Sequence, residues 1–263
     1  MILKLNDVSI IYQGTAAEVN RDQSTPPAKI KAVDGISFSA AQGENIALIG
    51  ENGAGKTTLL LAIVGILELS GGVIEADGMQ LTKKTVNEIR KKIGLVFQNP
   101  DDQLFMPYIY DDVAFGCRNF GMTEDEIQNK VDETLNQLNI SHLHNRSSLR
   151  LSEGEKRMAA IAAVLVMQPS VLMFDEPTAF LDHKARRTLI DILKKLNHTK
   201  IIITHDMRFA EEVCDRVIIL KNGRIAEDGN KTILYNKELM QNCGLEAMSC
   251  IAAMSCIAEK NGG

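Results

Sequence analysis

The sequence predicts an α/β protein built around a buried parallel sheet. Three short segments, Ile93–Phe97, Val171–Phe174 and Ile201–Thr204, are apolar and contain β-branched residues, and helical stretches lie between them. This is the pattern of parallel strands that crossover helices cover on both faces. With 263 residues, of which 45% are apolar and 24% charged, the chain fits one large domain or two modest ones that bury most of their apolar side chains.

The first part of the chain is expected to hold several strands and one apolar helix. Its start, MILKLNDVSI, alternates apolar and polar residues, as a strand with one buried face does. The expected elements are strands at Leu3–Ile10, Gly35–Ala40, Asn45–Ile49 and Val73–Ala76 and a helix from Lys56 to about Leu67. Residues 13–30 hold Gly14, Pro26 and Pro27 among mostly polar residues, which predicts a flexible surface loop.

The middle of the chain, between Phe97 and Pro169, is expected to be helical. Thr123 and Glu126 form the sequence pattern of a capping box, and the apolar residues that follow repeat at every fourth position, at 127, 131 and 135. We therefore predict a helical subdomain, at about residues 99–168, that is inserted into the sheet.

The last part of the chain is expected to contain a hairpin and a helical tail. Asn222 and Gly223 lie between the strand-like segments DRVIILK and RIAE, which predicts a tight turn. The tail, residues 230–263, contains the direct repeat AMSCIA at 247–252 and 253–258. It is apolar enough to dock on its own domain or in a partner interface, and the sequence leaves both open.

Composition and cysteine usage exclude several classes of protein. The net charge is −5 without basic blocks, which argues against a general nucleic-acid surface, so we expect no nucleic-acid partner. The longest apolar runs, at 59–67 and 158–167, fall short of the roughly 20 residues of a membrane-spanning helix. The start of the chain lacks the pattern of a signal peptide, so a cytosolic location is expected. The five cysteines show no CxxC pair and are expected to be reduced, mostly buried thiols.

A phosphate-binding motif follows the strand NIALIG. Residues 50–57 satisfy G-x-x-x-x-G-K-[ST], and they are Gly50, Glu51, Asn52, Gly53, Ala54, Gly55, Lys56 and Thr57. Glycines allow backbone N–H groups to surround phosphates, and the start of the next helix presents its positive end. Lys56 would neutralise the terminal phosphates, and the Thr57 hydroxyl is a ligand for Mg²⁺. A glycine turn that feeds a helix with an exposed lysine is the structural alternative.

Two carboxylates, Asp175 and Glu176, follow the apolar strand VLMF. Adjacent side chains of an extended segment point to opposite sides, so Asp175 can hold a metal ion while Glu176 orients or deprotonates a nucleophile. An acidic helix cap around Pro177 is the alternative. His205 directly follows the apolar strand Ile201–Thr204. Because parallel strands end at the same edge of a sheet, we expect His205 at the same edge as Asp175, where ligands bind in such folds.

These residues together resemble an ATP-binding cassette (ABC) ATPase from about residue 2 to residue 229. Gln98 ends GLVFQ as the glutamine of the family's Q-loop does, and LSEGE at 151–155 stands where the LSGGQ signature belongs. FLD at 180–182 resembles the D-loop, His205 resembles the switch histidine, and Tyr12 resembles the aromatic residue that stacks on adenine. All of these motifs occur in the family's order.

The resemblance implies a P-loop NTPase core with a parallel sheet, an antiparallel β subdomain and the inserted helical subdomain, within an ATPase domain at residues 1–229. It implies binding of ATP and Mg²⁺ and hydrolysis of ATP to ADP and phosphate. The implied catalytic residues are Glu176, His205 and Gln98, and the implied metal ligands are Thr57, Gln98 and Asp175. The implied ATP-binding residues are Tyr12, residues 50–57, Thr58, Ser152, Gly154 and Asp182.

The resemblance also implies partners. Two cassettes meet head to tail, as a homodimer or with a sister ATPase, and each ATP lies between one P-loop and the other signature. Two segments, FQNPDDQLF at 97–105 and DVAFG at 112–116, are similar to the energy-coupling factor and cobalt or nickel importer ATPases. Such ATPases attach to a transmembrane coupling protein and a substrate-binding membrane subunit, which implies a peripheral place on the cytoplasmic face of the membrane.

The signature departs from the usual pattern, with Glu153 in place of glycine and Glu155 in place of glutamine. Ser152 with Glu155 also fits an ordinary capping box, which is the competing interpretation. The sequence therefore favours an importer ATPase but leaves two alternatives, an ATP-binding scaffold with weak hydrolysis and an ATPase of another ABC transporter class.

Overall fold

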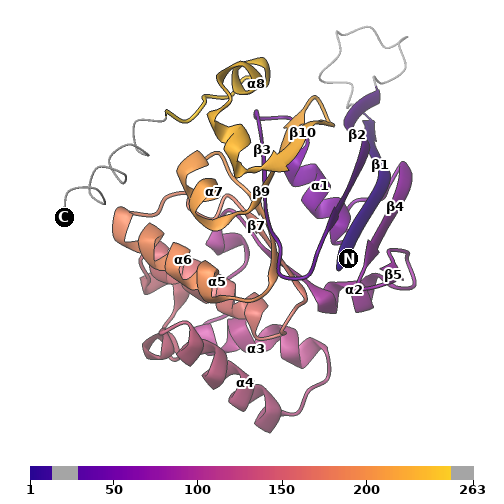
Figure 1. Ribbon diagram of the computed structural model, residues 1–263. Coiled ribbons are helices and arrows are strands. Elements are labelled where there is room, and N and C mark those ends of the chain that lie inside the picture. Colours follow the sequence, from indigo (N-terminus) through magenta and orange to yellow (C-terminus); the bar gives the residue numbers. More distant parts are fainter. Residues whose placement is uncertain (14–28, 250–263) are drawn as a thin grey trace, which may run out of the picture.

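The structure, a computed structural model, describes residues 1–13 and 29–249. Figure 1 shows how its helices and strands are arranged. In chain order they are β1 (Leu3–Gln13), β2 (Lys29–Ala40), β3 (Asn45–Gly50), α1 (Lys56–Ile63), β4 (Gly71–Ala76), β5 (Met79–Gln80), α2 (Val86–Lys92), β6 (Ile93–Val96), η1 (Pro100–Asp102), α3 (Ile109–Asn119), α4 (Glu124–Gln137), η2 (Ser141–Leu143), η3 (Ser148–Arg150), α5 (Glu153–Leu165), β7 (Val171–Asp175), α6 (His183–Lys195), β8 (Thr199–Ile203), α7 (Met207–Val213), β9 (Arg216–Lys221), β10 (Arg224–Asn230), η4 (Lys231–Tyr235) and α8 (Lys237–Asn242).

The main sheet has the strand order β10-β9-β3-β8-β7-β6. Neighbouring strands from β9 to β6 are parallel, and β10 joins β9 as an antiparallel edge. Both faces are buried: Ala47 and Ile49 of β3 belong to the core that packs against α3, α4, α5 and α6, whereas Ile46 and Leu48 belong to the core beneath α1 and β1. The predicted α/β class with a parallel sheet is confirmed.

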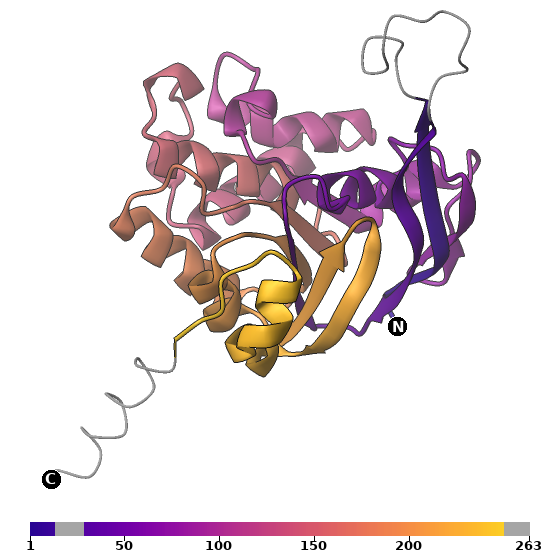
Figure 2. The same ribbon diagram turned by 90° about the horizontal axis from the view of Figure 1, so that it is seen from above.

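A second, antiparallel sheet of order β2-β1-β4-β5 lies beside the main sheet. Figures 1 and 2 both show its strands on the side of the molecule away from α6. The strands β1 and β2 are longer than the sequence predicts, because Tyr12 pairs with Ile30 and the ladder continues to the ends of the described segments. Residues 13, 29 and 30, which the sequence assigned to a surface loop, therefore belong to these strands, and residues 14–28 lie outside the described part of the chain.

Helix α1 ends at Ile63, four residues before the predicted end at Leu67. Gly65 adopts a left-handed conformation with φ 69°. Its N–H donates to Ala62 O at 2.9 Å, and the N–H of Ile66 donates to Leu61 O at 2.9 Å. These two bonds form a Schellman motif, which closes the helix although the apolar sequence continues.

The helices α3, α4 and α5 pack together below the main sheet in the view of Figure 1. The predicted capping box is confirmed, since the Thr123 hydroxyl accepts the N–H of Glu126 and the Glu126 carboxylate accepts the N–H of Thr123. Ile127, Val131 and Leu135, the apolar repeat of α4, are fully buried. One face of α4 is thus held in the core by the residues that predicted the helix.

The hairpin turn between β9 and β10 is confirmed, since Asn222 and Gly223 both have positive φ angles, 50° and 76°. Beyond β10 come η4 and α8, and residues 245–249 have no regular structure. The predicted helical tail is therefore helical only in part over its described residues. Most of the AMSCIA repeat, with Cys250 and Cys256, lies outside the described part. Cys117, Cys214 and Cys243 are buried free thiols, as predicted.

In the part of the chain that the structure describes, no helix combines the length and the apolar character needed to cross a membrane.

Candidate functional site

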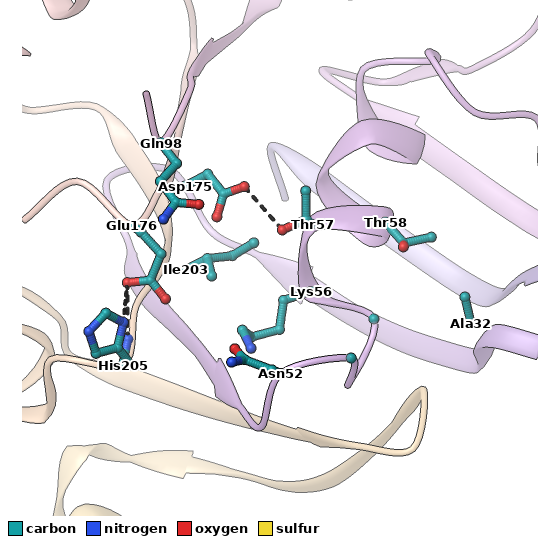
Figure 3. A pocket seen from close by; sticks show the side chains of 12 residues that line it. Ala32, Asn52, Lys56, Thr57, Thr58, Gln98, Asp175, Glu176, Ile203 and His205 are labelled. Carbon is teal, nitrogen blue, oxygen red and sulfur yellow. Dashed lines mark hydrogen bonds and ion pairs between the residues drawn. The ribbon is translucent and has the colours of Figure 1, made fainter. Parts of the chain in front are cut away.

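The parallel strands β3, β7 and β8 end at one edge of the main sheet, where a cavity of about 620 Å³ opens (Figure 3). Its size is within the usual range for small-molecule sites, about 300–1,000 Å³. The residues that line it are Ala32, Asn52, Gly53, Gly55, Lys56, Thr57, Thr58, Gln98, Asp175, Glu176, Ile203 and His205. The structure therefore brings together the end of β3, the acid pair, the Q-loop glutamine and the histidine that the sequence predicts to cooperate.

The loop after β3 depends on its glycines. Gly50, Gly53 and Gly55 have φ angles of 155°, 81° and 96°. A Cβ atom at Gly55 would lie 2.3 Å from the carbonyl oxygen of Ala32, and one at Gly50 would lie 2.4 Å from that of Leu220. Side chains are thus excluded at both positions. The loop leaves the first N–H groups of α1 without a side-chain cap, because Gly55 is the N-cap residue. Such a helix start binds anions.

The ammonium group of Lys56 lies across this loop. It donates to the carbonyl oxygens of Gly50 and Glu51 at 2.7 and 2.9 Å. Burial lowers the pKa of Lys56, and the nearby carboxylates of Glu176 and Asp175 oppose that shift. A cation held among carbonyls and carboxylates is suited to bind a polyanion that enters the cavity.

Thr57 and Asp175 meet on the floor of the cavity, where the hydroxyl donates to the carboxylate at 3.1 Å (Figure 3). Burial raises the pKa of Asp175, and the hydrogen bond from Thr57 works against that rise. The side chain of Gln98 lines the same cavity. Hydroxyl, carboxylate and amide oxygens are the hard ligands that Mg²⁺ prefers, so this donor set fits the implied metal ion.

Glu176 and His205 form a second pair that lines the cavity (Figure 3). The Glu176 carboxylate is 2.8 Å from His205 Nδ1 and also accepts the backbone N–H of His205 at 3.2 Å. The Glu176 side chain is 12% exposed, whereas that of His205 is 75% exposed. Glu176 has a φ of 44°, and its N–H donates to Ile203 O at 2.9 Å. A non-glycine residue at such a φ is strained, and the strained turn aims this carboxylate into the cavity.

Tyr12 lies beside the cavity and does not line it. Its hydroxyl donates to the Thr58 hydroxyl at 3.4 Å, and Thr58 does line the cavity. Two further residues that line the cavity, Ala32 and Ile203, were not among the predicted site residues. No motif marks them, because Ala32 reaches the cavity through the packing of β2 against the glycine loop and Ile203 reaches it as the last residue of β8.

Ser152, Gly154 and Asp182 do not line the cavity in a single chain. They lie at the starts of α5 and α6, which pack against each other. Asp182 caps α6 by accepting the N–H of Ala185 at 2.7 Å. A Cβ at Gly154 would lie 2.8 Å from the Cβ of Ala185, so glycine allows the two helices to approach.

The capping-box interpretation of the signature segment is confirmed. The Glu155 carboxylate accepts the N–H of Ser152 at 2.9 Å and its hydroxyl at 2.8 Å, and these bonds lower the pKa of Glu155. Glu153 pairs with Lys156 at 3.4 Å. Both unusual acids therefore have local partners, and contact of Ser152 and Gly154 with a nucleotide stays a prediction.

Comparison with known protein families gives one match over most of the first two thirds of the chain. The profile of the family described as ABC transporter matches residues 33–179. An ABC transporter ATP-binding protein of Geobacter sulfurreducens is 46% identical over 221 residues, 84% of this chain and 89% of that protein. The energy-coupling factor transporter ATP-binding protein EcfA of Carboxydothermus hydrogenoformans is 43% identical over 220 residues, 82% of each chain.

Two solved structures share the fold. The first is cbiO1 from Clostridium perfringens, part of the ABC transporter complex cbiONQ, with a TM-score of 0.75, 37% identity and coverage of 90% of this chain and 92% of that one. The second is a dimeric post-hydrolysis state of the ATP-binding cassette MJ0796 bound to ADP and Pi, with a TM-score of 0.74, 26% identity and coverage of 87% and 98%.

Proposed function

The chain belongs to the ABC transporter family and is one of its ATPases, and we propose that it is the ATP-hydrolysing subunit of an energy-coupling factor type importer for a vitamin, cobalt or nickel. The observation that carries the proposal is that two pairs, Thr57 with Asp175 and Glu176 with His205, face one cavity beside the glycine loop. The names of two relatives, EcfA and cbiO1 of the cbiONQ complex, support the importer type. Residues 1–229 would form the ATPase domain, with the helical subdomain at about 99–168.

In this proposal the glycine loop and the start of α1 hold the phosphates of ATP. Backbone N–H groups of residues 50–55 and the ammonium of Lys56 supply the donors. Tyr12 and Thr58 at the rim lie on the side where the base would rest. Mg²⁺ would be held by oxygen atoms of Thr57, Asp175 and Gln98, and it would supply positive charge that neutralises the terminal phosphates.

Glu176 would be the general base for hydrolysis. Its carboxylate orients the attacking water and accepts its proton as the bond to the terminal phosphate breaks. His205, which is within 2.8 Å of that carboxylate, would fix the orientation of Glu176 and lie near the charge that develops on the phosphate. Gln98 would sense the terminal phosphate from the end of β6.

A second cassette is needed in this proposal. Ser152, Gly154 and Asp182 lie outside the cavity of their own chain, so they would serve the cavity of the partner cassette. The partner is a second copy or a sister ATPase. The likeness to a dimeric cassette supports this arrangement.

The surface that would meet the membrane subunits lies after the Q-loop. Phe105 is exposed, and its ring packs edge-on against Phe115 of α3 at 5.0 Å between centroids. Exposed aromatic residues on a firm support are typical anchors of interfaces. We propose that this pair docks a transmembrane coupling protein, which would hold the chain at the cytoplasmic face of the membrane as a peripheral subunit.

Glu176→Gln tests the proposal. Loss of the base should reduce ATP turnover by about 10²- to 10⁴-fold while nucleotide binding persists, so the variant should accumulate as a nucleotide-bound dimer. Light scattering with Mg-ATP, with the sister ATPase added if one is required, measures this. Glu227→Gln on the exposed strand β10 is the matched control and should behave as wild type. A variant that binds ATP but remains monomeric would disprove the shared-site arrangement.

A further inference from the structure

A buried arginine joins helix α5, which begins at the signature segment 151–155, to the backbone around Gln98. Arg157 of α5 is 1% exposed and is among the largest fully buried side chains of the described residues. Its two terminal nitrogens donate to the backbone carbonyl oxygens of Phe97 and Gln98 at 2.7 and 2.6 Å. Its Nε atom has no hydrogen-bond partner among the described residues.

The two carbonyls flank the α-carbon of Gln98. Their directions therefore determine where the Gln98 side chain leaves the backbone, and that side chain lines the nucleotide cavity. The planar fork of the guanidinium offers a separate N–H group to each carbonyl in a fixed relative direction, whereas the donors of a lysine ammonium rotate about a single point charge. The contact thus fixes an orientation as well as a distance.

Packing does not explain why an arginine stands here. Burial lowers the pKa of Arg157, and the carboxylate of Glu153 only partly offsets it. An apolar side chain of similar size at such a site is often as stable as a buried charge or more stable. What offsets the cost of burying this charge is its pair of hydrogen bonds to the carbonyls on either side of Gln98.

Helix α5 also contacts the segment that follows Gln98 at two more points. Lys156 pairs with Asp101 at 2.8 Å, and the Gln103 side-chain amide donates to Ala160 O at 2.8 Å. Helix α5 begins next to Ser152. A movement of the signature segment would consequently be transmitted to the residues that follow Gln98.

We propose that Arg157 is a positioning residue that holds Gln98 in the nucleotide cavity and couples it to the start of α5. This inference rests on the proposed role of Gln98 in metal binding and hydrolysis. Arg157 itself does not line the cavity, and of the two residues whose carbonyls it bonds only Gln98 does.

The test compares Arg157→Met and Arg157→Lys with a matched control. Arg90 of α2 also donates to two successive carbonyls, of Val64 at 3.0 Å and Gly65 at 3.1 Å, but none of these three residues lines the cavity. Arg157→Met should lower kcat by at least about tenfold, since small misplacements of catalytic groups have effects of this size. Arg157→Lys should recover part of the loss, and Arg90→Met should leave kcat unchanged.

Two measurements other than activity separate positioning from folding. Hydrogen exchange of the peptide spanning 97–103 should become faster in Arg157→Met and stay at the wild-type rate in Arg90→Met. ATP affinity without Mg²⁺ should stay within about twofold of wild type, whereas the Mg²⁺ concentration for half-maximal turnover should rise, because only Gln98 is misplaced. Turnover is expressed per folded molecule, because Arg157→Met leaves two carbonyl oxygens without their donor and can lower the melting temperature.

Gln98→Ala decides whether a failure belongs to the inference or to the proposed function. If Gln98→Ala leaves turnover unchanged, the role proposed for Gln98 is wrong. If Gln98→Ala slows turnover and both Arg157 variants do not, the coupling is wrong. If Arg157→Met lowers the melting temperature and turnover per folded molecule stays normal, Arg157 is only structural. If the inference is right, Arg157→Met adds little to the loss caused by Gln98→Ala, since residues that act together are non-additive.

Discussion

Leu104 and Phe105 are neighbours in the chain with opposite environments, and replacing each by alanine should give opposite phenotypes. Leu104 is 5% exposed and belongs to the core shared with α3 and α5. Phe105 is 61% exposed and touches the ring of Phe115. The Asp112 carboxylate accepts the N–H of Phe105 at 2.9 Å and so fixes the backbone between the two environments. Packing and partner docking can therefore be perturbed separately.

The expected stability losses follow from these exposures. Leu104→Ala removes a buried side chain and should lower the free energy of unfolding by about 2–5 kcal/mol. Phe105 has about 40% of its surface covered, or about 80 Å² of a side chain that buries about 200 Å² when fully enclosed. At about 25 cal/mol per Å² the upper limit for Phe105→Ala is about 2 kcal/mol. Leu104→Ala should thus be the more destabilising variant.

Urea unfolding, ATP titration and co-purification with the membrane subunits measure the two effects. Phe105→Ala should keep the ATP affinity of wild type and lose association with the membrane subunits or substrate uptake. Leu104→Ala should keep association per folded molecule. The reasoning fails if Phe105→Ala is the less stable of the two, or if it unfolds more easily while uptake per folded molecule stays normal.

Three further substitutions test the site and the dependence of stability on acid pH. Lys56→Ala should weaken ATP binding in a titration, whereas His205→Ala should bind ATP almost normally and lower kcat, and an equal loss of affinity in both would contradict their roles. Asp206 caps α7 at Phe209 and accepts two bonds from Arg186 at 2.9 and 3.2 Å. Burial raises the pKa of Asp206, but these hydrogen bonds outweigh it and leave the pKa below its ordinary value. The stabilisation is therefore present above the unfolded pKa, about 3.9, and is lost as pH falls through the lower folded pKa. Asp206→Asn should lower the free energy of unfolding by about 1–3 kcal/mol at pH 7. Urea unfolding at low pH should show a smaller difference in this free energy between wild type and variant. A difference that does not change with pH would refute the assignment.

The sequence by itself determined the features that depend on short-range chemistry. Examples are the glycines of the phosphate loop, the capping box at Thr123 and the turn at Asn222. Each needs particular residue types within a few positions, so those residues predict the local structure. The short, continuously apolar segments with helical stretches between them likewise predicted the parallel sheet. Because parallel strands end at one edge, the presence of Asp175 and His205 at one cavity also followed from the sequence.

Local signals did not decide the outcome where two of them competed. The apolar run after Lys56 predicted a longer helix than α1, and the left-handed Gly65 ended it. At Ser152 the sequence fitted both a capping box and a nucleotide-binding signature, and the structure contains the capping box. Contact with a second cassette is a property of the assembly, which the pattern of one chain does not contain.

Only the tertiary structure decided which groups from distant segments lie at or near the cavity. Tyr12 lies at the rim and not on the wall, Ala32 reaches the glycine loop through its carbonyl, and Arg157 crosses from α5 to the Q-loop. It also placed Leu104 in the core and Phe105 at the surface. These outcomes depend on how separate elements pack, and packing sums many weak contacts between residues that are far apart in the chain. A local sequence pattern cannot encode that sum, because each contact depends on the position of both partners.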